Sequence, residues 1–172
     1  MRVWCTEIAL FVFASGAAMA QYIPRAPRSD SNTVVFVCEH GSVKSVVAMA
    51  YFTELARERH LPVKAISRGT NPEPRVPALV REGLKADGLP LGSFTPRKFS
   101  AADLTSAIAV ISFDQPSVAE IVAGRLPSSA WDGLPAVSEN YPVAREAIRV
   151  RVAALVDSLA KVQATRARRL PE

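Results

Sequence analysis

One stretch, residues 34–45, constrains the fold more than any other part of the chain. It reads VVFVCEHGSVKS, and its first four residues are apolar on both alternations, which is typical of a strand buried on two faces of a parallel sheet. From about Val43 the apolar residues have helical spacing, and the charged run 57–59 closes that helix. The stretch therefore predicts a strand, a loop over 39–42 and a helix in direct succession.

The predicted loop has the features of an anion site. Its backbone N–H groups have no strand partner, and the positive end of the following helix dipole lies beside them. Cys38 opens the loop and Lys44 follows six residues later, whereas glycines at the spacing of a nucleotide-binding loop are absent. The helix end and the ammonium stabilise a thiolate over a thiol, and the hydroxyl of Ser45 is placed to hydrogen-bond the sulfur. These features predict a nucleophilic sulfur aimed at the central atom of a bound oxyanion.

These residues also carry a family resemblance. The segment Cys38-Glu39-His40-Gly41-Ser42-Val43-Lys44-Ser45 resembles the catalytic loop of the low-molecular-weight protein tyrosine phosphatase and arsenate reductase superfamily, in which cysteine, five residues, arginine and serine follow a strand. The resemblance continues through Ser67-Arg68-Gly69-Thr70 and Ser112-Phe113-Asp114, and covers roughly residues 33–160. It implies a cysteinyl-phosphate intermediate on Cys38, with the phosphate held by Glu39, His40, Gly41, Ser42, Val43 and Lys44.

Two loop positions depart from the family pattern. Lys44 stands where the family has arginine, and an ammonium offers a point charge where a guanidinium grips two oxygens in a planar fork. We expect this change to weaken transition-state stabilisation by about 2 to 4 kcal/mol, as for loss of one oxyanion-hole donor. Gly41 stands where the family usually has asparagine. That change is benign because the position is expected at positive φ, which glycine adopts without steric cost.

The proton donor is not fixed by the sequence. The family uses an aspartate after its fourth strand, and Glu139 is the closest match here, whereas an alternative alignment on Trp131 puts Leu134 at that position. Asp132 is the second candidate. Asp114 is expected to brace a loop or a helix terminus instead. The predicted catalytic residues are Cys38, Lys44, Ser45 and Glu139.

Residues 1–20 differ in kind from the rest of the chain. Arg2 precedes an apolar stretch over 8–13, and small residues follow at 18–20, as in a secretory signal peptide. The apolar stretch is too short to span a bilayer. We therefore expect a periplasmic or secreted protein that is not embedded in a membrane after cleavage.

Cleavage would leave Cys38 as the single cysteine, because Cys5 is removed with the signal. The cleaved chain forms no internal disulfide, and arsenate reduction would need an external thiol. The competing interpretation of Cys38 is a small apolar residue that ends a core strand. Residues 21–32 have the proline, arginine and serine content of a linker.

The composition indicates one globular domain over 33–163, followed by a basic tail at 164–172. With 172 residues, 49% hydrophobic and 22% charged, the chain is long enough for a substantial core. Its formal net charge of +5 suits an anionic ligand. No aromatic-interleaved basic patch indicates nucleic acid, and no ligand pair has metal-binding spacing, so neither a metal nor a cofactor is expected.

Strands and helices alternate along the domain. Further strands are expected at 62–66, 107–113 and 134–138, and further helices near 76–88, 100–103, from Pro116 and from Pro142. Leu79, Ile121 and Val162 are among the residues expected to face inward. This alternation predicts an α/β fold with three layers, a parallel sheet between helices on both faces, and the resemblance implies four strands in the order 2-1-3-4.

Ligands of such sheets bind beyond the carboxyl ends of the strands, where the sequence places Cys38, Ser67, Arg68, Asp114 and Glu139. The leading hypothesis is an exported hydrolase of phosphate monoesters, with phosphotyrosine in a phosphorylated protein among the candidate substrates. The alternatives are an oxyanion-binding module of the same fold without catalysis, and an arsenate reductase that uses an external thiol.

Overall fold

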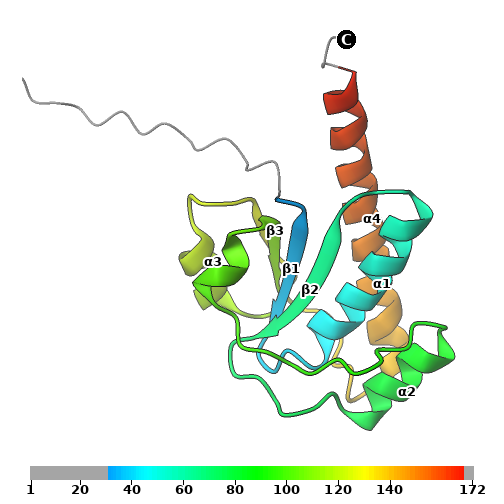
Figure 1. The fold of residues 1–172 in the computed structure, drawn as a ribbon. Coiled ribbons are helices and arrows are strands. Elements are labelled where there is room, and N and C mark those ends of the chain that lie inside the picture. The colour runs from blue at the N-terminus through cyan, green and yellow to red at the C-terminus, as the bar shows by residue number, and fades with distance from the viewer. Residues whose placement is uncertain (1–30, 169–172) are drawn as a thin grey trace, which may run out of the picture.

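Four parallel strands form the central sheet of the computed structural model, which describes residues 31–168 (Figure 1). The strands are β1 (Thr33–Cys38), β2 (Lys64–Gly69), β3 (Ala107–Ser112) and β4 (Ser128–Ala130). Their order in the sheet is β2-β1-β3-β4, which confirms the predicted order. β2 begins and ends later than the 62–66 strand that the sequence predicted.

The carboxyl ends of the four parallel strands meet at one edge of the sheet. Cys38 at the end of β1 pairs with Gly69 at the end of β2, and Val37 pairs with Ser112 at the end of β3. Ser112 in turn pairs with Ala130, the last residue of β4. The segments that follow the four strands therefore lie together.

Helices cover both faces of the sheet, as predicted (Figure 1). On one face lie α1 (Lys44–Glu58), α2 (Ala78–Ala86) and α4 (Tyr141–Ala167), and on the other lies α3 (Pro116–Val122). A short 3-10 helix, η1 (Ala101–Leu104), precedes β3. It begins with a reciprocal hydrogen-bonded cap between Ser100 and Asp103, which confirms the capping pattern seen in the sequence.

Side chains along β1 point alternately to the two faces of the sheet, and this alternation decides which face the side chain of Cys38 lies on. Val35 and Val37 pack toward α3, whereas Phe36 and Cys38 belong to the larger cluster beneath α1 and α4. Four rings, Phe36, Phe52, Phe113 and Trp131, contact one another in that cluster. Every residue of β1 is buried, as expected for a central parallel strand.

The predicted position of the fourth strand is wrong. Residues 134–138 do not pair with the sheet, although Leu134 and Val137 are buried in the core. The strand is Ser128–Ala130, whose side chains are all exposed. Its place is decided by backbone pairing with β3 and not by apolar side chains. Sequence periodicity therefore gives no signal for it.

Three residues expected to face inward are close to half exposed: Leu79 at 48%, Ile121 at 47% and Val162 at 48%. α2 and α3 are short, and each buries one narrow stripe, Val80 with Leu84 and Val118 with Val122. The last turns of α4, which contain Val162, project past the other elements (Figure 1). These turns include residues 164–167, so part of the predicted tail is helical.

Several predictions concern residues outside 31–168. They are the signal peptide at 1–20, the early cysteine Cys5, nearly all of the linker, and the end of the basic tail. Asn32 already belongs to the domain, because its N–H donates to Ser106 and its carbonyl accepts from Lys64. Of the helices within the described residues, none combines the length and apolar character that crossing a membrane requires.

Candidate functional site

The loop between β1 and α1 turns its carbonyl groups outward. The carbonyls of residues 38–40 accept hydrogen bonds of 2.8 to 3.1 Å from backbone N–H groups in the segment 70–73. No backbone N–H of residues 39–43 donates to another residue within 31–168. The first N–H groups of α1 are also free of intrahelical acceptors. The result is a run of unused donors around the end of β1, which is the arrangement of an anion-binding nest.

Two glycines allow the loop backbone to lie directly against the end of β2. Gly41 has φ +62°, which confirms the positive φ expected at this position. A Cβ on Gly41 would lie 2.6 Å from the backbone nitrogen of Gly69, and a Cβ on Gly69 would lie 2.7 Å from the nitrogen of Gly41. The close contact between these two backbones fixes the curvature of the loop.

The sulfur of Cys38 sits at the base of this loop. Cys38 is 6% exposed, and its Sγ lies 3.0 Å from Oγ of Ser45. The hydroxyl of Ser67 lies 2.8 Å from Oγ of Ser45 and 3.2 Å from the carbonyl of Gly41. When the single proton of Ser67 goes to Ser45, the proton of Ser45 is directed at the sulfur, which stabilises a thiolate. The predicted Cys38–Ser45 contact is therefore present.

Lys44, which the sequence predicts to stabilise the thiolate and hold the phosphate, has two hydrogen-bond partners outside the loop. Its Nζ donates to Oδ2 of Asp114 at 2.7 Å and to the carbonyl of Leu134 at 3.0 Å. The hydrogen bond from Lys44 holds the pKa of Asp114 below its ordinary value, and the N–H of Gly133, 3.0 Å from Oδ1, acts in the same direction. Asp114 thus has the bracing role that the sequence suggested.

The candidate proton donors differ in their positions. Asp132 follows β4 almost directly, and its Oδ1 accepts the backbone N–H of Asp114 at 2.8 Å. Glu139 is exposed in the turn before α4, and its carboxylate makes no hydrogen bond or ion pair with any residue of 31–168. The expectation that Glu139 follows the fourth strand is therefore wrong, because that strand ends earlier. Leu134 contributes a carbonyl to Lys44 and a buried apolar side chain.

The remaining predicted residues have varied surroundings. Glu39 and His40 lie on the exposed side of the loop, with Nε2 of His40 3.9 Å from Oε2 of Glu39. Val43 is half-buried where α1 begins. Arg68 turns away from the loop, because its Nε donates to Asp103 of η1 at 2.7 Å. Arg68 is thus a structural residue of the sheet edge.

Glu73 was missed by the sequence reasoning. The buried hydroxyl of Ser42 donates to its Oε2 at 2.5 Å, so this carboxylate ties the loop to the segment after β2. The available signal was the run Pro72-Glu73-Pro74, in which two fixed φ angles present one charged side chain. Within the described residues, no cluster of histidine, cysteine, aspartate or glutamate is suited to hold a metal ion.

The loop and its surroundings match a known family. The model of the family described as "Low molecular weight phosphotyrosine protein phosphatase" matches residues 33–126. The matched region contains the loop, β2 and β3, and it ends before Asp132 and Glu139. The family match therefore covers the nucleophile and its donors but not the candidate acids. No curated protein has a sequence that matches this chain.

Solved structures of similar fold agree with this match. YfkJ from Bacillus subtilis is 21% identical with a TM-score of 0.68, over 78% of this chain and 98% of that one. An arsenate reductase from Archaeoglobus fulgidus is 27% identical, TM-score 0.58, over 72% and 98% of the two chains. The YwlE arginine phosphatase from Geobacillus stearothermophilus is 17% identical, TM-score 0.59, over 82% and 99%. At these identities the likeness supports the fold.

Proposed function

Since the chain belongs to the low molecular weight phosphotyrosine protein phosphatase family, we propose that it hydrolyses phosphate monoesters through a cysteinyl-phosphate intermediate at residues 38–45. The observation that carries the proposal is the run of unused N–H donors from 39 to 43 around the sulfur of Cys38. Fixed main-chain donors suit a tetrahedral oxyanion and need little reorganisation as charge develops on its oxygens.

In the proposed reaction the thiolate of Cys38 attacks phosphorus, a sulfur–phosphorus bond forms, and the bond to the ester oxygen breaks. The leaving oxygen takes a proton from Asp132, whose Oδ1 accepts the N–H of Asp114, the hydrogen-bond partner of Lys44. Water then attacks phosphorus, its proton returns to Asp132, and the sulfur leaves as thiolate. Ser45 stabilises the thiolate before the first step and after the second.

The proposal extends to substrate and location. Phosphotyrosine is the first substrate to test, because the family name points to it. Export rests on residues 1–20, whose composition is that of a secretory signal. Amino-terminal sequencing of the protein from the periplasmic fraction tests this, and a chain that begins at Gln21 supports export. A chain that stays in the cytoplasm with Met1 or Arg2 at its start contradicts it.

A second candidate function is oxyanion binding without turnover. The specific observation in its favour is that the ammonium of Lys44 donates to Asp114 and to the carbonyl of Leu134. In addition, a lysine has no guanidinium fork with which to hold two oxygens of the anion. Arsenate reduction is the weaker enzymatic alternative. Cys38 is the only cysteine after residue 20, so the second sulfur would have to come from an external thiol.

Hydrolysis of para-nitrophenyl phosphate separates the first two candidates. We expect turnover in the wild-type chain, none in Cys38→Ser, and phosphate binding in both by calorimetry. Phosphate binding without turnover in either protein would favour the binding module. In that case Lys44→Arg tests whether the loop lacks only the fork, because a gain of activity would come from bidentate contact with the phosphoryl group. Absence of phosphate binding would contradict both functions.

A further inference from the structure

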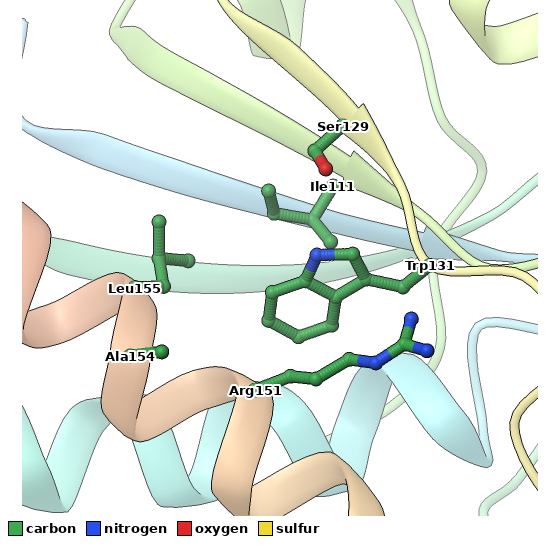
Figure 2. A pocket seen from close by; sticks show the side chains of 6 residues that line it. All are labelled: Ile111, Ser129, Trp131, Arg151, Ala154 and Leu155. Carbon is green, nitrogen blue, oxygen red and sulfur yellow. The ribbon is translucent and has the colours of Figure 1, made fainter.

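A hollow of about 310 Å³ lies between the β4 edge of the sheet and α4 (Figure 2). Its walls are formed by Ile111, Ser129, Trp131, Arg151, Ala154 and Leu155. None of these residues belongs to the loop 38–45, although Trp131 directly precedes Asp132 in the chain. The hollow is shallow and open to solvent, so it would cover one face of a small ligand.

The walls of the hollow combine one flat ring with aliphatic side chains. The indole of Trp131 occupies the centre, with Ile111 on one side of it and Leu155 and Ala154 beyond its six-membered ring (Figure 2). The side chain of Arg151 extends along the indole from α4 (Figure 2). An apolar or aromatic body placed here would cover the aliphatic side chains of the walls and the small part of Trp131, 8%, that remains exposed.

Three polar groups of the hollow are hydrogen-bond donors without a partner among the described residues. Within residues 31–168 the guanidinium of Arg151, the indole N–H of Trp131 and the hydroxyl of Ser129 make no hydrogen bond or ion pair. The other arginines at this end of α4 are occupied, because Arg145 pairs with Asp87 and Arg149 pairs with Glu146. Arg151 acts only at longer range, where its charge helps to lower the pKa of Asp114. The hollow therefore offers a positive charge and donors that have no hydrogen-bonded acceptor among residues 31–168.

We propose that this hollow binds a small aromatic carboxylate. The planar guanidinium of Arg151 takes the carboxylate through two parallel hydrogen bonds, and the aromatic body lies against Trp131 and Leu155. Inorganic phosphate lacks the apolar body that these walls would cover. This binding does not depend on turnover at Cys38, so it holds for an enzyme and for a binding module alike.

The experiment uses the full chain with Trp4→Phe, which leaves Trp131 as the only tryptophan. The indole N–H resonance of Trp131 is followed by NMR during titration with 2-naphthoate, and then with the neutral 2-naphthamide. We expect 2-naphthoate to bind about tenfold tighter or more, since the hydrogen bonds to a charged group are worth more than those to an amide. Arg151→Gln should remove this difference, and Arg151→Lys should retain part of it.

Arg149→Gln is the matched control, because it removes a neighbouring arginine whose partner is Glu146. Equal affinities for acid and amide, or equal losses in Arg149→Gln and Arg151→Gln, would overturn the proposal. So would displacement of 2-naphthoate by saturating phosphate, which would put its carboxylate in the loop 38–45. Absence of any shift of the Trp131 resonance at millimolar 2-naphthoate would overturn it as well.

Discussion

The two halves of the candidate site are built in different ways. The half around the nucleophile is buried: Ser45 and Ser67 are 0% exposed, and the loop lies backbone to backbone against β2. The half after β4 is exposed at Asp132 and Glu139, and its connection to the loop is made by Lys44 and Asp114.

This difference separates binding from chemistry. The backbone N–H groups that would hold an oxyanion are positioned by buried residues. Protonation of a leaving group depends instead on the exposed carboxylates after β4. Changes after β4 should therefore affect turnover and leave phosphate affinity nearly unchanged. Changes in the packing of the loop should affect both.

The largest expected effect comes from the exposed half. Asp132→Asn should reduce turnover of a substrate with a poor leaving group, such as phenyl phosphate, by about 100-fold or more, the usual contribution of a general acid. Glu139→Gln should change turnover by less than about threefold, since its carboxylate makes no hydrogen bond or ion pair with a described residue. Steady-state kinetics with phosphate inhibition as a binding control measures both. The reverse pattern would return the acid role to Glu139.

The next largest effect concerns the close contact between the loop and β2. Gly41→Ala should lower the free energy of unfolding by about 2 to 4 kcal/mol, because a Cβ is strained at φ +62° and meets the backbone of Gly69. Gly133→Ala, at φ +68° with no atom within 4 Å of the added Cβ, should lower it by only about 1 kcal/mol. Urea unfolding measures both. Equal losses would mean that the contact adds nothing to the strain at positive φ.

A smaller effect is expected at the sulfur. Ser45→Ala should reduce turnover by about 10- to 100-fold, because a hydrogen bond to a charged group contributes about 1.5 to 3 kcal/mol. Ser42→Ala serves as control, since its hydroxyl bonds Glu73 and not the sulfur. The rate of iodoacetate labelling of Cys38 across pH gives a second readout. If both variants lose turnover equally, Ser45 does not stabilise the thiolate.

The smallest effect concerns the link between the halves. Lys44 lowers the pKa of Asp114 below its ordinary 3.8, so the ionised pair stabilises the fold above about pH 4, and this contribution is lost as pH falls below that value. The difference in unfolding free energy between wild type and Asp114→Asn should be constant from pH 7 to about 5 and shrink below 4. Since Asp114 is half exposed, it should stay below about 1 kcal/mol and decrease with salt. A difference that grows in acid would contradict the pairing.

The sequence was sufficient to predict the secondary structure of the buried half of the site. A two-sided apolar strand, a cysteine, a glycine and a following helix are local features, and the structure has them at 33–58 as predicted. It failed at the fourth strand, where Ser128–Ala130 pairs through its backbone alone and Leu134 enters the core from a loop, although the helices expected from Pro116 and Pro142 are present. The contacts of Lys44 with Asp114 and of Ser42 with Glu73 join residues far apart in the chain. Spacing carries no information about such pairs.

The depth of the Cys38 sulfur also limits which oxidants can reach it. A mixed disulfide requires a second sulfur to approach in line, and this approach is hindered at a side chain that is 6% exposed. Small oxidants such as hydrogen peroxide are less hindered, and they would convert the thiolate to a sulfenic acid. Residues 31–168 hold no neighbouring thiol to resolve that acid, so its reduction would fall to a small thiol from solution.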